Sequence, residues 1–277
     1  MAPLIHLDEW QDECATVPEV EQALIGLRLR RGFEGKRNLR TSVLTHLAWV
    51  PQVWQQAATE TLAGLAERHP SRTLLLFPEP EGEDGLSARA FLECYEAPGT
   101  DRHLCNEVAE LRLRGARAEA PASIVLPLLL PDLPVFLRWR GRPSFDSAVF
   151  AQLVEVVDRL VGDSAEWTDV PAAYSALAEI FEQVTVSDIA WRRTFPWRRT
   201  LAQAWPEVPD RLTGPPAETA LVAGWLASRG GVEVSVERAD ELPAGDGRAP
   251  SDLLSEELDV YARDPVYEEA VRTAGRL

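Results

Sequence analysis

The sequence predicts an α/β fold: a layered mixed sheet with βαβ units and a hairpin, followed by a smaller, mainly helical α+β C-terminal part. Two observations carry this prediction. Short apolar runs rich in β-branched residues alternate with segments of helical periodicity, and one pair of strand-like runs is separated by a turn signal. Beyond residue 167, helical patterns dominate.

The first βαβ unit lies near the N-terminus. Thr41–Val50 is apolar and β-branched and predicts a buried strand, and Arg72–Phe77 predicts a second one. Pro51 begins a helix between them, since proline is favoured in a first helical turn. Its inward stripe is predicted to be Val53, Ala57, Ala58, Thr61, Leu62 and Leu65. A strand, a helix and a strand in so short a span indicate a parallel unit.

A hairpin is predicted next. Ala88–Ala97 and Leu104–Gly115 read as strands on either side of the turn signal Pro98–Asp101. A two-residue turn at its centre would place Cys94 directly opposite Cys105. We expect two small buried residues there, with no bond between them.

The second unit leads to the first candidate site residues. Pro121–Leu130 predicts a buried helix, Leu133–Arg140 a strand, Phe145–Val157 an amphipathic helix and Asp158–Asp163 a strand. Sites in open α/β sheets form beyond the carboxyl ends of the strands. Asp163 and the residue after it are therefore predicted to lie at such an end.

The C-terminal part reads as helices around one strand. The predicted helices are Pro171–Val184, Ile189–Arg193, Trp197–Trp205, Ala217–Ser228 and a terminal helix or pair over Leu253–Ala274, broken at Pro265. Val232–Arg238 alternates and predicts a half-exposed strand. We divide the chain into a peripheral N-terminal arm (1–39), which contains a helix from Pro18, an α/β domain (40–166) and a helical α+β domain (167–277).

Composition excludes several classes of function. The chain has 44 acidic and 28 basic residues and a net charge of −16, so nucleic acid and membrane are poor partners. The apolar run Ile124–Leu137 is broken by prolines and is too short to span a bilayer. Three cysteines, Cys14, Cys94 and Cys105, read as free thiols, and with no signal peptide in view they indicate a cytoplasmic protein.

No motif for chemistry stands out. No glycine-rich phosphate loop follows a strand, the four histidines have no metal spacing, and no serine has the flanks of a hydrolase nucleophile. We therefore expect no cofactor, no metal and no catalytic residue. Asp163, Glu166 and Asp188 could do acid–base work. Acids paired with Arg193 or Arg198 are the favoured interpretation.

The stretch Ser187–Arg198 is the most unusual in the chain, because indoles and guanidinium groups gather in it. Such side chains are enriched where a surface makes strong contacts. Our hypothesis assigns partner contact to Trp167, Trp191, Arg193, Trp197 and Arg198. The supporting residues that orient them are Asp163, Ser164, Glu166 and Asp188. The equal alternative is that the tryptophans are core and the arginines pin an interface inside the protein.

Five stretches in order carry a family resemblance. They are HPSRT (69–73), LLPDLPVFLRW (129–139), VDRLVGDSAEW (157–167), SDIAWRRTFPWR (187–198) and AGWLASR (223–229). Together they resemble the glucose-6-phosphate dehydrogenase assembly protein family, OpcA. Arg192, where a small residue is usual, and Phe195 depart from the family pattern.

The resemblance implies a non-catalytic protein that binds glucose-6-phosphate dehydrogenase and favours its active oligomer, in support of the oxidative pentose phosphate pathway. Such an effector must bind the active form more tightly than the inactive one. Self-association is left open. The alternative function is a sugar-phosphate-binding protein or enzyme that uses Asp163, Glu166 and Arg193. A phosphate-sized pocket that holds the arginines would favour this alternative, and a tryptophan-rich patch would favour the effector.

Overall fold

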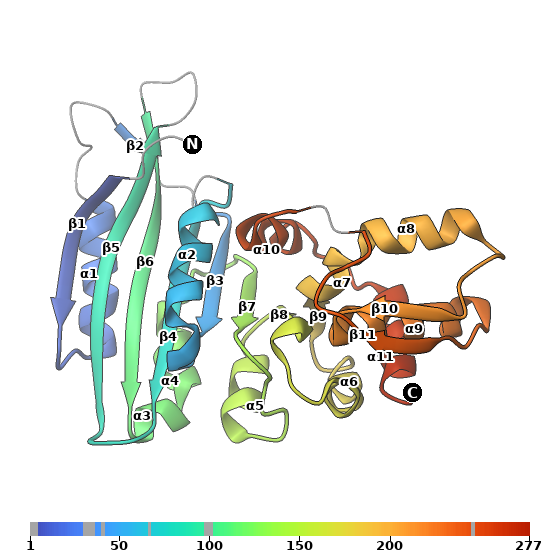
Figure 1. The fold of residues 1–277 in the computed structure, drawn as a ribbon. Helices are drawn as coiled ribbons and strands as arrows, with labels where there is room; N and C mark the ends of the chain where they lie inside the picture. The colour runs from blue at the N-terminus through green and yellow to red at the C-terminus, as the bar shows by residue number, and fades with distance from the viewer. Residues whose placement is uncertain (1–4, 30–36, 40–41, 66–67, 97–101, 245–246) are drawn as a thin grey trace. The chain divides into compact units, whose positions relative to one another are not determined.

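The computed structural model describes residues 5–29, 37–39, 42–65, 68–96, 102–244 and 247–277 (Figure 1). The chain divides into two compact units. Unit 1 consists of Met1–Arg140 and Asp146–Asp158, and unit 2 consists of Gly141–Phe145 and Arg159–Leu277. The predicted α/β class is confirmed: unit 1 holds a mixed sheet with helices, and unit 2 is mainly helical. The predicted boundary after Glu166 differs from this division, because the strand that precedes it already belongs to unit 2.

The sheet of unit 1 has the strand order β1-β5-β6-β4-β3-β7, with β2 paired to β6. Its strands are β1 (Ile5–Asp12), β2 (Arg37–Leu39), β3 (Leu44–Trp49), β4 (Ser71–Glu79), β5 (Gly85–Glu96), β6 (Arg102–Arg114) and β7 (Val135–Trp139). Its helices are α1 (Val17–Leu29), α2 (Gln55–Leu65), α3 (Ala116–Glu119), α4 (Pro121–Val125) and α5 (Ala148–Val154). The strands β4, β3 and β7 are parallel, and β1, β5 and β6 are antiparallel.

The predicted parallel βαβ unit is confirmed as β3–α2–β4. All six residues of β3 are buried, as its apolar composition predicts. Val53 is an exception to the predicted stripe, since it is 85% exposed. It lies in a 3-10 turn, Gln52–Trp54, which precedes α2 and directs its side chains differently from an α-helix.

The hairpin is confirmed in its register, and one expectation about it is wrong. Cys94 and Cys105 are paired opposite each other, as predicted, but they form a disulfide. Directly opposed residues of an antiparallel pair bring their Cβ atoms close enough for a bond. The turn predicted at Pro98–Asp101 lies outside the described residues. The cytoplasmic expectation rested on three free thiols, and Cys14 alone is free.

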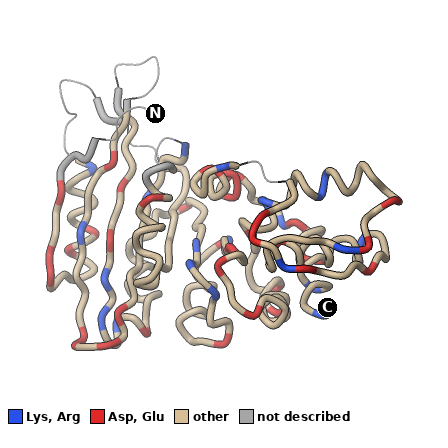
Figure 2. The backbone as a smooth tube through the Cα atoms, viewed as in Figure 1, with Lys and Arg blue, Asp and Glu red and all other residues tan. Residues whose placement is uncertain are grey.

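The N-terminal segment is part of the sheet rather than the peripheral arm that we expected. β1 pairs with β5 along its length, and the buried residues of α1 are Val20, Leu24 and Leu27. Glu107 on β6 accepts hydrogen bonds from Arg28 on α1, at 2.6 Å, and from Arg72 on β4. Burial alone would raise the pKa of Glu107, but the two arginines hold it below its ordinary value. A buried carboxylate with two cations thus ties α1 to the sheet. Figure 2 shows that acidic and basic positions are distributed along the backbone of both units. The loop predicted between Arg28 and Arg37 lies mostly outside the described residues.

Unit 2 is built from helices and two short pairs of parallel strands. Its strands are β8 (Arg159–Gly162), β9 (Thr185–Asp188), β10 (Arg211–Gly214) and β11 (Ser235–Arg238), paired as β8–β9 and β10–β11. Its helices are α6 (Val170–Glu179), α7 (Ile189–Arg193), α8 (Phe195–Ala204), α9 (Pro216–Gly230), α10 (Pro250–Leu258) and α11 (Pro265–Ala274). β10 was not predicted, because it lies in a proline-rich connection. The residues of β11 are all exposed, not half-exposed.

Helices α9 and α11 form the centre of unit 2. A Cβ atom on Gly224 would lie 2.3 Å from the carbonyl oxygen of Ala270, so only glycine allows the two backbones to approach this closely. α11 begins where Pro265 was predicted to break the terminal helix. Asp264 precedes it and accepts hydrogen bonds from the backbone amides of Val266 and Tyr267. This cap places the Asp264 carboxylate next to the predicted site.

Candidate functional site

The predicted site begins at the carboxyl ends of β8, as the strand-end argument requires for Asp163, and of β9, a strand that was not predicted. Asp163 follows β8 and caps the 3-10 helix Ser164–Glu166, and Asp188 ends β9 and caps α7. Asp188 Oδ1 accepts hydrogen bonds from the amides of Ser164 and Ala190, at 3.0 and 2.9 Å. One buried carboxylate therefore joins the ends of the two strands.

Arg193 lies among carboxylates. Its guanidinium group donates to Asp163, at 2.9 Å, and to Glu218 on α9. Its side chain is 25% exposed, and the side chain of Glu218 only 3%. Burial alone would lower the pKa of Arg193, but the two carboxylates raise it above its ordinary value. We call Arg193, Asp163 and Glu218 the Arg193 cluster. It holds the end of α7 against the 3-10 helix Ser164–Glu166 and against α9, which is a structural role.

Ser164 and Asp188 belong to a buried polar network beside this cluster. Ser164 Oγ shares a 2.8 Å hydrogen bond with the hydroxyl group of Tyr174, which also donates to the carbonyl group of Ala217. Burial and the nearby charge of Asp163 raise the pKa of Asp188 to about 6, although its hydrogen bonds act against this. The carboxyl group of Asp188 thus titrates well above an ordinary aspartate.

Arg198 has different neighbours. Its guanidinium carbon lies 3.4 Å from the centre of the Trp191 ring and 5.8 Å from that of Phe195, a cation–π arrangement. Its nitrogens donate to the hydroxyl group of Thr194 and to the carbonyl group of Trp191. Burial lowers the pKa of Arg198 to about 10, partly opposed by the nearby carboxylate of Asp264. We call Arg198, Trp191, Thr194 and Phe195 the Arg198 cluster.

The three predicted tryptophans are buried. Trp167, Trp191 and Trp197 are 8%, 6% and 5% exposed. Trp167 packs on Phe145 and on Gly162, and Trp191 donates its ring N–H to Asp264 at 2.9 Å. Trp197 belongs to a core cluster of α8, α9 and β10. Their part in partner contact stays a prediction, and their observed contacts are those of core residues.

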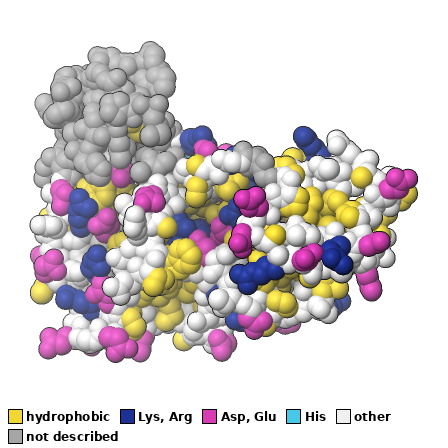
Figure 3. Space-filling model, in the orientation of Figure 1, with side chains coloured by type: hydrophobic (Ala, Val, Ile, Leu, Met, Phe, Trp, Pro, Cys, Tyr) yellow, Lys and Arg dark blue, Asp and Glu magenta, His cyan; other side chains and the backbone are white. Residues whose placement is uncertain are grey.

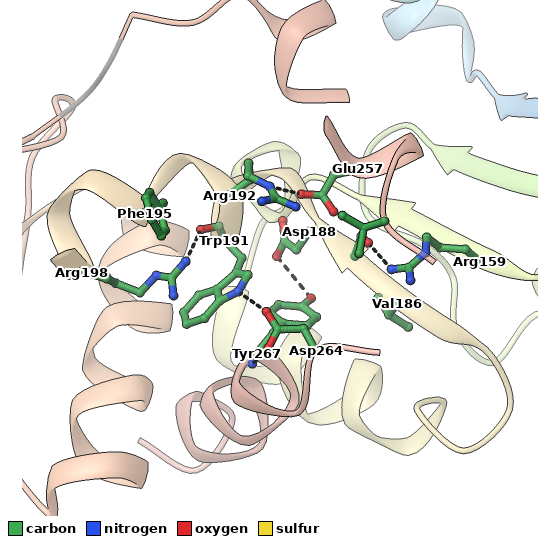
Figure 4. Close-up of a pocket in the computed structure, with 12 residues that line it drawn as sticks. Arg159, Val186, Asp188, Trp191, Arg192, Phe195, Arg198, Glu257, Asp264 and Tyr267 are labelled. Carbon is green, nitrogen blue, oxygen red and sulfur yellow. Dashed lines mark hydrogen bonds and ion pairs between the residues drawn. The ribbon is translucent and has the colours of Figure 1, made fainter. Parts of the chain in front are cut away.

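A cavity of about 230 Å³ opens beside α7 (Figure 4). Its wall carries three guanidinium groups, those of Arg159, Arg192 and Arg198, and the rings of Trp191, Phe195 and Tyr267. Its carboxylates are those of Asp188, Glu257 and Asp264. Of the nine predicted site residues, only Trp191, Arg198 and Asp188 line it.

The residues that sequence reasoning missed come mainly from the C-terminal helices. Glu257 lies on α10, Tyr267 on α11, and Asp264 just before α11. The Asp264-Pro265 pair carries the signal of a helix start, but nothing in the sequence places that start against α7. Arg159 lies within the stretch VDRLVGDSAEW, but no local pattern there distinguishes a cavity-lining arginine from any other.

The alternative sugar-phosphate site at Asp163, Glu166 and Arg193 is not favoured by this geometry. Arg193 already donates to two carboxylates, and Glu166 accepts the amide N–H of Gly141 at 2.7 Å. A phosphate would have to displace these acids. Within the described ranges, no group of three or more His, Cys, Asp or Glu side chains could hold a metal ion. No described helix has the length and apolar character needed to cross a membrane.

An apolar surface follows α8 from Phe195, which also lines the cavity, to Trp205, which follows the helix. Phe195 is 52% exposed and Trp205 48% exposed. Trp205 packs on Gly230, where a Cβ atom would lie 2.2 Å from its ring, and a groove of about 210 Å³ separates it from Trp225. Figure 3 shows hydrophobic side chains gathered over α8 and β10. We call Phe195, Trp205 and Trp225 the α8 surface.

The comparisons with known proteins agree on one family. Residues 63–179 match the model described as "Glucose-6-phosphate dehydrogenase subunit N-terminal domain". A Synechococcus elongatus protein, provisionally named OxPP cycle protein OpcA, is 30% identical over 180 residues, which cover 60% of this chain and 40% of the relative. Proteins of the same name from Nostoc punctiforme and Synechocystis are 28% and 24% identical, again over 60% of this chain and over 39% and 38% of the relatives.

The match is partial in length. The aligned region spans about two fifths of each of these relatives. No solved structure matches the chain. The resemblance drawn from five sequence stretches is confirmed.

Proposed function

The chain is related to the OpcA family, and from this relationship we propose that it binds glucose-6-phosphate dehydrogenase and favours the active oligomer of that enzyme without being an enzyme itself. The observation that carries the proposal is the family match over residues 63–179, whose description names the dehydrogenase. The relatives' names place them in the oxidative pentose phosphate cycle. A cytoplasmic location follows from this partner and is part of the proposal.

The α8 surface is the part of unit 2 best suited to such a contact. Tryptophan and arginine are the residues most enriched at the energetic centres of protein interfaces, and phenylalanine is also enriched there. Phe195, Arg199 and Trp205 are exposed on or next to α8. The predicted contact residues Trp191, on α7, and Trp197, on α8, have buried side chains. In this proposal they position the helices, and their exposed neighbours meet the partner.

The activation itself is tested by titration. Purified protein is added to glucose-6-phosphate dehydrogenase from the same source, and the initial rate is followed against substrate, with the protein alone as a control. We expect a saturable gain in rate and no rate from the protein alone. An unchanged rate at every ratio would contradict the proposal, and a rate from the protein alone would contradict its non-catalytic part.

The contact surface is tested by a double variant, Phe195→Ala with Trp205→Ala. Both side chains are about half exposed, so their loss leaves most of the core intact. We expect the concentration needed for half-maximal activation to rise at least ~tenfold, the effect of losing one interface centre. The matched control is Tyr261→Ala, an aromatic that is 61% exposed outside α8. Equal activation by the double variant and the control would exclude this surface.

A further inference from the structure

Two arginines on the wall of the cavity beside α7 have no direct ion pair within the described parts of the chain. Arg159 is 3% exposed, and it donates to the hydroxyl group of Ser187 and the carbonyl group of Ala262. Arg198 likewise donates to a hydroxyl and a carbonyl group. Neither forms an ion pair with any carboxylate in the described parts of the chain. Buried charge without a directly paired counter-ion is unfavourable, so an anion in the cavity would be stabilised.

The carboxylates on the wall are already occupied by donors. Glu257 accepts Arg192 Nε at 2.6 Å, and Asp264 accepts the Trp191 ring N–H together with two backbone amides. Asp188 accepts the two strand-end amides, and burial keeps its pKa high. None of them forms an ion pair with Arg159 or Arg198. Glu257 and Asp264 act on Arg159, and Asp264 acts on Arg198, through space and without a direct contact.

From this geometry we propose that the cavity binds a small phosphate monoester with a sugar-like body, with the guanidinium groups of Arg159 and Arg198 as its anion contacts. Guanidinium forks match the oxygen spacing of a phosphate group, and these two are not committed to a carboxylate. Figure 4 shows these arginines approaching from different elements, Arg198 from α8 and Arg159 from β8. The proposal does not rest on the proposed function, since it needs no second protein.

The size and the rings of the cavity define the body of the ligand. About 230 Å³ is below the roughly 300–1,000 Å³ of sites for drug-sized ligands, so a dinucleotide is excluded and a sugar phosphate is favoured. Trp191 and Tyr267 lie 5.8 Å apart and present apolar ring surface beside the arginines. Phe195 stands half exposed on the same wall. The C–H groups of a sugar ring would pack on these faces while its phosphate meets the guanidinium groups.

The test is isothermal titration calorimetry of the whole chain, without the dehydrogenase. The probes are glucose 6-phosphate, inorganic phosphate and glucose. We expect glucose 6-phosphate to bind most tightly, inorganic phosphate to bind more weakly and glucose not to bind. No heat with either phosphate, or equal binding of glucose and glucose 6-phosphate, would overturn the proposal. Equal binding of the two phosphates would overturn its sugar part.

Two variants locate the site. Arg198→Met should weaken glucose 6-phosphate binding at least ~tenfold, because a charge-assisted hydrogen bond is lost. The matched control is Arg199→Met, since Arg199 is exposed on the same helix and does not line the cavity. Arg159→Met is expected to act like Arg198→Met. If its burial prevents folding, Arg198→Met and Arg198→Lys carry the test alone. Unchanged binding by folded Arg198→Met would place the anion elsewhere and overturn the proposal.

Discussion

Arg193 and Arg198 come from the same short motif and lie in opposite electrostatic surroundings. Arg193 is held by two carboxylates, Asp163 and Glu218. Arg198 is held by an indole face, a hydroxyl group and a carbonyl group, and it borders a cavity. The comparison separates an arginine that the fold uses internally from one that it leaves available to an anion.

The two arginines diverge because the chain changes direction between them. Thr194 ends α7 and precedes the first residue of α8, and Pro196 in the first turn of α8 supports the new start. Thr194 is fully buried, and its hydroxyl group donates to the carbonyl group of Trp191. The side chains on the two sides of this junction therefore point toward different elements, although they are close in sequence.

Arg193→Met tests the internal half of the comparison and has the largest expected effect. It leaves Asp163 and Glu218 facing each other without a cation. Breaking a buried ion pair lowers the free energy of unfolding by roughly 3–5 kcal/mol. We expect a decrease of about 3 kcal/mol here, because Arg193 is partly exposed. Urea unfolding followed by circular dichroism measures the change in the free energy of unfolding.

The control for Arg193→Met is Arg211→Met. Arg211 pairs with Glu237 on the surface of the β10–β11 pair, with side chains 66% and 56% exposed. We expect the free energy of unfolding to fall by less than about 1 kcal/mol, as for other surface ion pairs. Similar losses in the two variants would mean that the Arg193 cluster contributes no more than a surface ion pair.

The fold was largely predictable because most of its elements have strong local patterns. The buried strand β3, the hairpin register and the start of α11 at Pro265 follow from apolar runs, turn residues and proline chemistry. The role of the N-terminal segment was not predictable, because strand pairing between β1 and β5 is a long-range contact with no local signal. The strand β10 was not predictable either, because the prolines near it indicate a loop.

The site was predictable in its position but not in its composition. The strand-end argument correctly located Asp163, whereas Asp188 ends β9, a strand that the sequence did not predict. Residue type alone could not show that Arg193 would meet Glu218, or that Glu257 and Asp264 would arrive from the C-terminal helices. Interface-type residues are also core-type residues, and burial decides between them only after folding. Trp191 and Trp197 illustrate this, since both are buried.

Asp188 lies between the two clusters, and its titration gives the next largest effect. Its pKa is about 6 in the fold and about 3.9 in an unfolded chain, so the folded state binds more protons between these values. Stability is therefore highest below pH ~4, falls as the pH rises to ~6 and is then level with respect to this group. One pKa unit corresponds to 1.36 kcal/mol, so the change is on the order of 1–3 kcal/mol. Asp188→Asn should remove it.

The measurement is the free energy of unfolding against pH from 4 to 8 for both proteins. The asparagine oxygen can still accept the amides of Ser164 and Ala190, so the variant keeps the cap. Glu93 in unit 1 is a matched control, since burial and Glu110 raise its pKa to about 7. The free energy of unfolding should also fall with rising pH because of Glu93, and this fall should continue to a higher pH than the one caused by Asp188. Glu93→Gln should remove it. A wild-type slope that survives in Asp188→Asn would show that Asp188 does not cause it.

Arg198→Met tests the open half of the comparison and has the smallest expected effect on stability. The variant loses a cation–π contact, worth roughly 0.5–2 kcal/mol, and hydrogen bonds to neutral acceptors. It also removes a guanidinium group that is mostly buried without a carboxylate, and this relief offsets the loss. We expect the free energy of unfolding to change by no more than about 1 kcal/mol without ligand.

Glucose 6-phosphate should then raise the melting temperature of the wild type more than that of the variant, because a ligand stabilises only the state that binds it. The comparison would fail if Arg198→Met were as unstable as Arg193→Met and if glucose 6-phosphate raised the melting temperatures of the wild type and of Arg198→Met equally. Both arginines would then have the same structural role.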